Sequence, residues 1–314
     1  MAMKFARSLN VAAIIGATFS LVAAAHAAPA KEPLVTHEWV QKNLENPKVR
    51  VIEVSVDTGV YERGHIPGAL NFNWHNDLVD KVNRDIVSKA NFEKLIQSAG
   101  VDKDTTVVLY GDNNNWFAAW GAWIFHTYGL GDQVRLLDGG RKIWELNKLP
   151  VDTKAASVKA TEFKLPDGKP NLRARLADVI AAADKKADVQ LLDIRSPDEY
   201  QGKIFAPEGV KELSVRAGHV PGAINIPWGK NVNQETGAFK SVEELKKLYS
   251  DAAIDGKKPV IAYCRIGERS SLSWFVLTQL LGYDAKNYDG SWTEYGNSVG
   301  APIANLAGTV WTGK

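Results

Sequence analysis

One sulfur atom dominates the chemistry that this sequence could perform. Cys264 is the only cysteine of the chain, and Arg265 and Arg269 place two positive charges close to its thiol. Nearby cations stabilise the reactive thiolate and bring the pKa of a cysteine from about 8.5 to about 3.5–7.5. A lone cysteine is also compatible with an inert, buried side chain. Two arginines, a glycine and two serines within seven residues of an inert thiol would be costly to bury, so we interpret Cys264 as a nucleophile.

The residues on either side of Cys264 predict a strand that turns sharply into a helix. Residues 260–263 are apolar, and residues 271–281 have apolar side chains at helical spacing before Gly282. We therefore expect residues 264–269 to form a tight loop. Such a loop points successive backbone N–H groups inward, at the positive end of the following helix dipole. The sequence thus predicts an anion-binding active site that also stabilises a thiolate.

An internal repeat sets the domain organisation. Gly-His-Ile-Pro-Gly-Ala-Leu-Asn at 64–71 returns as Gly-His-Val-Pro-Gly-Ala-Ile-Asn at 218–225. Likewise, Val-Val-Leu-Tyr at 107–110 returns as Val-Ile-Ala-Tyr at 260–263. The chain therefore contains two copies of one domain in tandem.

The two copies differ at the position of the nucleophile. In the first copy Gly111 stands where the second has Cys264, so only the second copy is expected to be catalytic. We expect the first copy to form one wall of a cleft between the domains. Trp116 and Phe117 begin a core helix of the first copy and could reach that cleft. The second copy carries an extra segment, residues 203–216, which is a candidate surface loop or flap.

Each copy has short apolar stretches separated by helical ones, which is typical of an α/β fold. We predict a parallel sheet covered by helices on both faces in each copy. The predicted domains are residues 28–151 and 172–314, and the segment 152–171, with its Lys-Leu-Pro-Asp-Gly-Lys-Pro run, is the predicted linker. The strands are expected at residues 49–54, 107–110 and 134–137 of the first copy and at residues 190–194, 259–263 and 285–288 of the second.

The start of the chain has the features of a secretory signal peptide. Lys4 and Arg7 precede an apolar stretch, and Ala-His-Ala at 25–27 ends it with small residues. The small residues and this ending disfavour a membrane anchor or a buried helix. We expect residues 1–27 to be removed and the protein to be periplasmic or secreted. No later window is long and apolar enough to span a bilayer.

Composition excludes several classes of protein. The chain is 45% hydrophobic and 24% charged, as in ordinary globular proteins. Loss of residues 1–27 removes Lys4 and Arg7 but no acid, which leaves equal numbers of basic and acidic residues and argues against a nucleic-acid partner. With no later apolar window, we expect no membrane partner either. An exported chain with one cysteine forms no internal disulfide. The six histidines lack metal-ligand spacing, so we expect no metal. We also expect no organic cofactor and a monomer.

Together, the motifs resemble the rhodanese family of sulfurtransferases. The resemblance covers residues 34–311 and rests on Cys-x-x-x-x-Arg after a Tyr-ended strand, on the Gly-His turn at 218–225 and on a terminal Asp-Gly-Ser-Trp-x-Glu-Tyr. The doubled arrangement with an inactive first copy is similar to tandem-domain thiosulfate sulfurtransferases. The resemblance implies that Cys264 accepts sulfur as a persulfide and that Arg195 contacts the anionic group of the substrate. It also implies a loop that cradles the persulfide, formed by Arg265, Ile266, Gly267, Glu268, Arg269 and Ser270.

Two loop residues depart from the family pattern. Ile266 stands where some animal thiosulfate enzymes have a second basic residue, and Glu268 adds a negative charge. We expect the Glu268 carboxylate to point outward or to pair with an arginine. For Arg195, an ion pair with Asp198 or Glu199 is an open alternative to contact with the substrate.

The expected reaction moves the outer sulfur of thiosulfate through Cys264 to cyanide or a thiol and releases sulfite. Three other classes stay open. A cysteine-dependent phosphatase or arsenate reductase typically has the spacing Cys-x5-Arg, whereas this chain has Cys-x4-Arg. A 3-mercaptopyruvate sulfurtransferase typically has Cys-Gly-Ser-Gly, with glycine in place of Arg265. A non-catalytic sulfur carrier would hold a persulfide without turnover.

Overall fold

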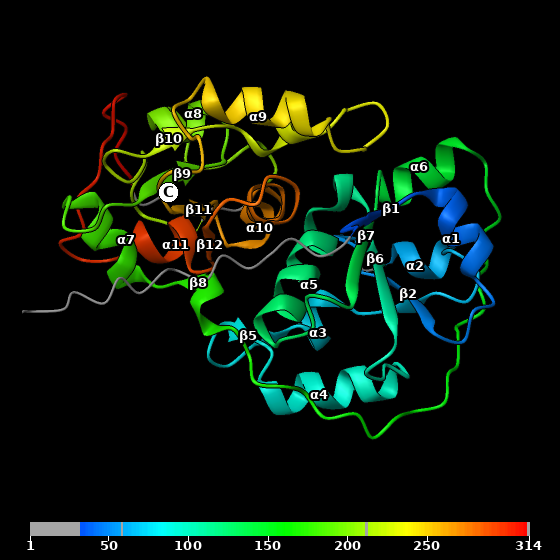
Figure 1. Ribbon diagram of the computed structural model, residues 1–314. Coiled ribbons are helices and arrows are strands. Elements are labelled where there is room, and N and C mark those ends of the chain that lie inside the picture. Colours follow the sequence, from blue (N-terminus) through cyan, green and yellow to red (C-terminus); the bar gives the residue numbers. More distant parts are fainter. Residues whose placement is uncertain (1–31, 58, 211–212, 313–314) are drawn as a thin grey trace, which may run out of the picture.

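The computed structural model describes residues 32–57, 59–210 and 213–312. The signal peptide predicted for residues 1–27 lies outside the described residues. The described chain forms two α/β domains that pack side by side (Figure 1). Within these ranges, no helix has the length and apolar character needed to cross a membrane.

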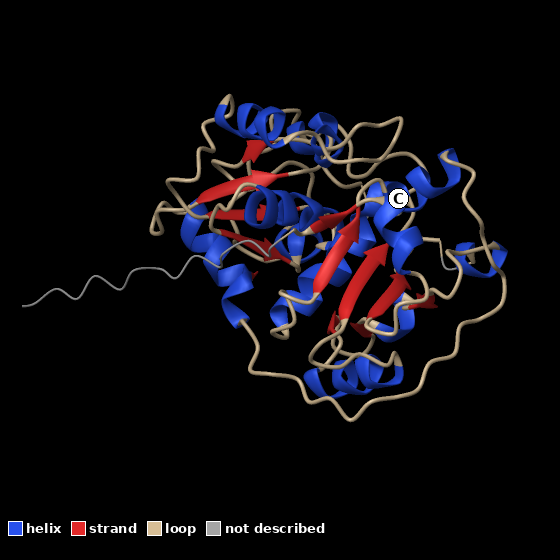
Figure 2. Ribbon diagram, turned by 45° about the vertical axis from the view of Figure 1, so that its right-hand side comes forward, coloured by secondary structure: helices blue, strands red, loops and turns tan. Residues whose placement is uncertain are grey.

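Each domain is built on a parallel sheet of five strands, and the two sheets have the same order. The longest strands are buried on both faces, as in sheets covered by helices on either side (Figure 2). The predicted fold class is therefore confirmed. In spatial order, sheet 1 contains β1 (Leu34–Val35), β7 (Val134–Leu137), β6 (Thr106–Tyr110), β2 (Val49–Glu53) and β3 (Leu70–Asn71), and sheet 2 contains β8 (Arg173–Ala174), β12 (Ala285–Tyr288), β11 (Val260–Tyr263), β9 (Gln190–Asp193) and β10 (Ile224–Asn225).

Helices connect these strands, and one small antiparallel hairpin, β4 (Val79–Asp80) and β5 (Asp85–Ile86), projects from domain 1. Domain 1 contains α1 (His37–Asn43), α2 (Val60–Arg63), α3 (Trp74–Asp77), α4 (Lys89–Ser98), a 3-10 turn (Asn113–Asn115), α5 (Trp116–Thr127) and α6 (Gly140–Leu146). Domain 2 contains a 3-10 turn (Pro170–Leu172), α7 (Leu176–Ala183), α8 (Pro197–Gln201), a 3-10 turn (Trp228–Asn231), α9 (Val242–Ser250), α10 (Glu268–Phe275), a π-helical turn (Val276–Leu280) and α11 (Ser291–Tyr295).

Helix α5 explains why the two domains form one body. Its residues 117–127 are all buried, and a helix that is apolar all round needs neighbours on every side. Sheet 1 covers one side, and α10 of domain 2 packs beside it (Figure 1). His126 of α5 meets the ring of Trp274 edge to face at 5.3 Å. One cluster of buried apolar side chains therefore continues from domain 1 into domain 2.

The helix predicted over residues 271–281 starts three residues earlier than expected, whereas its end before Gly282 was predicted to within a residue. Helix α10 begins at Glu268 and ends at Phe275, and a π-helical turn follows before Gly282. Gly267 adopts a left-handed φ of 99°, which turns the chain into the helix at once. Apolar spacing missed the first turn because its residues, from 268 to 270, are polar.

Candidate active site

Cys264 lies where the central strand of sheet 2 ends. It follows β11 directly, and four residues after it α10 begins. The backbone N–H of Gly267 donates a hydrogen bond to Sγ at 3.1 Å, and the Ser291 hydroxyl lies 3.9 Å from the same sulfur. The cysteine side chain is fully buried. The loop is therefore tighter than predicted, residues 264–267, and the later residues of the predicted loop form the first turn of α10.

Opposing effects set the pKa of the Cys264 thiol. Burial alone would raise this pKa, because it disfavours the charged thiolate. The guanidinium of Arg269 and hydrogen bonds from Ser270 and Gly267 outweigh burial and hold the pKa of the thiol below its ordinary value. The structure therefore places the only cysteine of the chain in a field that favours the thiolate.

Ser291 supports the sulfur from the neighbouring strand. Its hydroxyl accepts a hydrogen bond from the Cys264 N–H at 3.0 Å and donates one to the Tyr288 carbonyl at 2.7 Å. Ser291 has a φ of 50°, a conformation that non-glycine residues rarely adopt and that often marks a functional site. Sequence reasoning did not assign Ser291 to the site. The available signal was its position just after β12, because parallel neighbouring strands end at one edge of a sheet.

The other predicted loop residues are divided between the cleft and the interior. Arg265, Ile266 and Arg269 line the cleft between the domains. Gly267 faces the interior, where a Cβ atom would lie 2.5 Å from the Asp289 carbonyl oxygen. The hydroxyl of Ser270, also buried, donates to the carbonyl of Gly267 at 3.0 Å and so closes the turn.

The expected orientation of Glu268 was wrong. Glu268 is 7% exposed, and it lines the cleft between the domains rather than the outer surface. Among the described residues, no arginine lies within ion-pair distance of its carboxylate. Burial raises the pKa of Glu268 well above its ordinary value, and the negative charges of Cys264 and Asp289 raise it further. The carboxyl group of Glu268 therefore competes with the thiol for a single negative charge.

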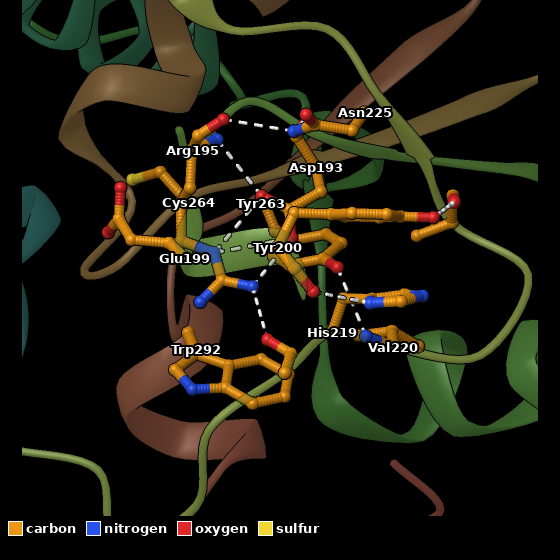
Figure 3. Close-up of polar contacts among 12 residues, drawn as sticks. Asp193, Arg195, Glu199, Tyr200, His219, Val220, Asn225, Tyr263, Cys264 and Trp292 are labelled. Atoms are coloured by element: carbon orange, nitrogen blue, oxygen red, sulfur yellow. Dashed lines mark hydrogen bonds and ion pairs between the residues drawn. The ribbon is translucent and has the colours of Figure 1, made fainter. Parts of the chain in front are cut away.

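Arg195 is committed to a buried ion pair (Figure 3). Its guanidinium donates to both carboxylate oxygens of Asp193, at 2.6 Å for the Nη2–Oδ2 pair, and to the carbonyl of Gly218 at 2.7 Å. Both charged side chains are at most 1% exposed, and the guanidinium carbon lies 4.5 Å from the ring centre of Trp292. Arg195 therefore forms an ion pair, but its partner is Asp193 and not Asp198 or Glu199, the two acids that the sequence suggested. Contact between Arg195 and the substrate stays a prediction that this geometry does not favour.

Glu199 pairs with the active-site loop. One of its carboxylate oxygens lies 3.5 Å from Nη2 of Arg269, and the other accepts hydrogen bonds from the N–H and hydroxyl of Ser196 at 2.9 Å. The Glu199 carboxylate is fully buried, and the Arg269 side chain is 15% exposed. Glu199 therefore holds the guanidinium that lowers the pKa of the Cys264 thiol.

The cleft between the domains consists of two adjoining cavities that share the loop as a common wall. One, the aromatic cavity, has a volume of about 450 Å³. The other, the hairpin cavity, has a volume of about 420 Å³. As the repeat predicted, domain 1 forms the opposite wall. The aromatic cavity is lined by Trp74, Trp116, Phe117 and Trp228 together with Arg265 and Arg269.

Several cleft residues could not be assigned from sequence. Trp74 of α3 and Arg84 of the β4–β5 hairpin come from short elements that carry no repeated motif. Trp228 follows the Gly-His turn and is far from Cys264 in sequence, so its place in the aromatic cavity could not be inferred. Pro207 and Val210, from the extra segment of the second copy, also line the aromatic cavity.

The Gly-His turns have the same structural role in both domains. His65 stacks on Tyr61 with 3.8 Å between ring centres, and His219 stacks on Tyr200 with 3.6 Å. Each ring also bonds the backbone carbonyl of its tyrosine partner through Nδ1. This repeated packing explains His65 and His219 as structural residues of the turns, with no need for a role in chemistry.

Comparison with known proteins agrees with this architecture. The family description "Rhodanese-like domain" matches two stretches of the chain, residues 36–147 and 176–298. The chain belongs to the rhodanese-like domain family. The match falls once on each of the two sheets, so both copies are rhodanese-like domains.

This rhodanese-like protein aligns with its relatives over nearly their whole length. A protein of Mycolicibacterium smegmatis named "Putative thiosulfate sulfurtransferase" is 52% identical over 272 residues, which are 86% of this chain and 96% of that protein. "Sulfur carrier protein TtuD" of Thermus thermophilus is 49% identical over 277 residues, 87% of this chain and 96% of that protein. The solved structure of SseA from Escherichia coli, described as a 3-mercaptopyruvate sulfotransferase, has a TM-score of 0.72 at 24% identity and covers 83% of this chain and 99% of its own.

Proposed function

We propose that this protein is a thiosulfate sulfurtransferase that carries sulfur as a persulfide on Cys264. The observation that carries the proposal is the setting of the thiol, which accepts an amide hydrogen bond, has a lowered pKa and follows a strand end beside a cleft lined by Arg265 and Arg269. Cationic side chains attract an anionic donor, and a thiolate is the form of cysteine that attacks it. The name of the Mycolicibacterium smegmatis relative agrees with this donor.

The first half of the reaction loads the enzyme. The Cys264 thiolate attacks the outer sulfur of thiosulfate, and a new S–S bond forms as the S–S bond of thiosulfate breaks. The bonding electron pair leaves with sulfite, whose charge Arg265 and Arg269 stabilise through charge-assisted hydrogen bonds. Because the sulfur is fully buried, the donor reaches it after a shift of the loop side chains that line the cleft.

The second half of the reaction unloads the enzyme. A nucleophile attacks the outer sulfur of the persulfide, and the electron pair of that S–S bond returns to the sulfur of Cys264. Cyanide leaves as thiocyanate, and a thiolate acceptor leaves as a persulfide. The protein supplies the positive field that keeps Cys264 ionised after each transfer.

Intact mass spectrometry tests this proposal. Thiosulfate alone should add the mass of one sulfur atom to the protein, and cyanide should then remove it. The Cys264→Ala variant should show no such adduct. A folded wild-type protein without the adduct would contradict the persulfide mechanism.

A sulfur carrier is the second candidate, because the Thermus thermophilus relative has that name. A carrier and an enzyme share the loaded state, but only an enzyme turns over many times with a small acceptor. Measuring kcat/KM for thiosulfate, 3-mercaptopyruvate and an aryl phosphate on one preparation separates the carrier, the two sulfurtransferases and the phosphatase.

We also propose that the protein is exported after removal of residues 1–27, on the strength of the Ala-His-Ala ending. A fully buried thiol suits a protein with one unpaired cysteine in an oxidising compartment. N-terminal sequencing of the protein from a periplasmic or culture fraction should begin at Ala28. A sequence that begins at Met1 would contradict export.

A further inference from the structure

We propose that the aromatic cavity is the binding site of the sulfur acceptor, and that this acceptor is an organic thiol with a flat, apolar body. The inference rests on the proposed sulfurtransferase function. The cavity encloses about 450 Å³, a size typical of sites for small organic molecules. Thiosulfate and cyanide are much smaller than this space, so neither accounts for it.

The aromatic rings of the cavity come from both domains. Trp116 and Trp228 meet across the domain boundary at 5.1 Å between ring centres, and Trp74 lies 4.4 Å from Phe117. Aromatic walls stabilise flat apolar groups by burial and by ring stacking. The rings themselves offer a thiosulfate dianion no hydrogen bonds; those come from Arg265 and Arg269 on the loop side of the cavity. The walls therefore match an organic acceptor better than they match the donor.

Core packing alone does not explain these tryptophans. Five other tryptophans of the chain are at most 2% exposed. Trp74, Trp116 and Trp228 are only partly buried, although they lie at the boundary between two packed domains. The structure thus keeps large apolar surfaces accessible next to the sulfur loop, as expected for a binding site.

The chemistry of the acceptor step fits this position. The acceptor thiol releases its proton to solvent, and its thiolate attacks the outer persulfide sulfur, which extends about 2 Å beyond Sγ. The persulfide S–S bond breaks, its electron pair returns to Cys264, and the acceptor leaves with a new S–S bond. Ile266 and Arg269 line the cavity on the side of the sulfur loop, so the body of the acceptor lies against the loop that carries the persulfide.

Single-turnover discharge of the preloaded enzyme tests the inference. Benzyl mercaptan and 2-mercaptoethanol, two thiols of comparable acidity, should discharge the wild-type persulfide at different rates, with benzyl mercaptan faster by about tenfold. Trp228→Ala should slow benzyl mercaptan by about 3–10-fold, the size of a lost aromatic contact, and leave 2-mercaptoethanol and loading by thiosulfate within about twofold. Trp311→Ala, which removes a 56% exposed tryptophan that does not line the cavity, should change neither rate.

Equal discharge rates for the two thiols in the wild type would overturn the acceptor site, as would equal slowing of both thiols by Trp228→Ala. Failure to load with thiosulfate would instead contradict the proposed function. Loading is measured first, by mass, so the two failures are distinguishable.

A second inference rests on an independent contact. Arg84, from the hairpin of domain 1, donates from Nη2 to the Ile266 carbonyl at 3.3 Å. The N–H at the other end of the same peptide unit is that of Gly267, which donates to the sulfur of Cys264 at 3.1 Å. We infer that Arg84 is a positioning residue, which orients and polarises a peptide unit that bonds the sulfur.

The hairpin is held in place for this contact. Arg84 has a left-handed φ of 51°, and the next residue, Asp85, forms an ion pair with Arg173 at 2.5 Å. Arg173 in turn bonds Asp289 of domain 2 at 3.0 Å. Domain 1 therefore contributes a charged contact to the loop as well as a wall to the cleft.

Titration of Cys264 by its rate of alkylation with iodoacetamide tests this role. Arg84→Gln should move the midpoint to higher pH and slow persulfide loading by about two- to fivefold, as expected for a solvent-screened bond from a charged donor. Arg84→Lys should restore part of the change. Lys81→Ala removes a charge from the same hairpin without touching the loop carbonyl and should leave the midpoint unchanged. An unchanged midpoint in Arg84→Gln, or an equal shift in Lys81→Ala, would overturn the assignment.

Discussion

The two domains build the same buried ion pair from different positions of the sequence. In domain 2, Arg195 follows strand β9 and donates hydrogen bonds to Asp193 and to the carbonyl of Gly218 in the Gly-His turn. In domain 1, Arg141 comes from α6, far along the chain, and makes the same two kinds of contact with Glu53 and with the matching glycine. The pair ties the Gly-His turn to the sheet in both domains. Because the domain without the cysteine keeps it, we interpret it as a structural element.

A second difference between the domains lies around Cys264, where different side chains bond the same backbone groups. In domain 2 the Ser291 hydroxyl accepts from the N–H of Cys264 and donates to the carbonyl that ends the neighbouring strand. In domain 1 the amide of Asn115 makes both bonds, accepting from Gly111 at 2.9 Å and donating to the equivalent carbonyl at 2.6 Å. The same backbone groups are satisfied by different side chains.

The backbone around position 111 leaves no room for a nucleophile in domain 1. A Cβ atom on Gly111 would lie 2.2 Å from the carbonyl oxygen of Val54, and a Cβ on Gly140 would lie 2.2 Å from the Asn115 amide. Restoring a cysteine at position 111 would therefore not restore a site. Domain 1 differs from domain 2 in the packing around the strand end as well as in lacking the cysteine.

Loss of the nucleophile should have the largest effect. Cys264→Ser should reduce thiocyanate formation by at least about 10³-fold, since a hydroxyl does not form a persulfide. Adding Gly111→Cys to that variant should restore no activity and should lower stability, because of the contact with Val54. Thiocyanate assays and urea unfolding measure both. Recovered activity in the double variant would show that the domains are interchangeable.

The buried arginines should affect stability more than chemistry. Arg195→Met leaves the Asp193 charge unpaired and should cost about 3–5 kcal/mol of unfolding free energy. Arg141→Met should cost less, because that guanidinium is 12% exposed. Urea unfolding gives both values. A folded Arg195→Met protein with a strongly raised KM for thiosulfate would instead support a contact between Arg195 and the substrate.

Arg269 should control the thiol. Arg269→Ala removes the charge that most lowers the pKa of Cys264, so alkylation should require higher pH, and kcat/KM for thiosulfate should fall by about 10–150-fold. In the wild type, the lowered pKa adds stability at high pH, and this contribution is lost as pH falls through the folded-state pKa. Arg63→Ala, in an exposed ion pair of domain 1, is the control and should leave both readouts unchanged.

Glu268 should act in the opposite direction. Glu268→Gln removes a carboxyl group that competes with the thiolate, so the pH profile of persulfide loading should move to lower pH. The raised pKa also predicts a stability effect. Protonated Glu268 stabilises the folded state below the ordinary pKa of a glutamate, about 4.3. This stabilisation is lost as pH rises through the raised pKa of Glu268 in the folded protein. Measured at pH 4 and pH 8, the free energy of unfolding of Glu268→Gln should rise relative to that of the wild type at pH 8. A wild-type profile in Glu268→Gln would contradict the competition.

The matching loop of domain 1 should give the smallest effect. Asp112 accepts hydrogen bonds from the N–H groups of Val56 and Asp57, so Asp112→Asn should lower stability slightly. Sulfur transfer per folded molecule should stay within about twofold of wild type, as measured by thiocyanate formation. A tenfold loss would place the domain 1 loop in the mechanism.

Sequence was sufficient for the features that depend on local order along the chain. The repeat gave the doubled α/β fold, and the apolar runs gave the central strands to within a residue or two. The position of Cys264 between a strand and a helix followed from the same spacing.

Contacts between distant residues were not accessible in the same way. The outward orientation expected for Glu268 failed because its burial depends on domain 1 closing over the loop, as does the contact of Arg84 with Ile266. The partner of Arg195 was missed although Asp193 is only two residues away, and although residues i and i+2 of an extended chain lie on the same face. Aromatic residues of the cavity converge from three separate segments.

Helix α5 also has a consequence for the order of folding. Domain 1 leaves the ribosome first, at about 5–20 residues per second, and the partner surface on α10 follows only after the linker and most of domain 2 have been made. During those seconds the apolar side of α5 faces water. A fragment that stops at residue 151 should therefore self-associate, because it lacks the part of domain 2 that covers α5.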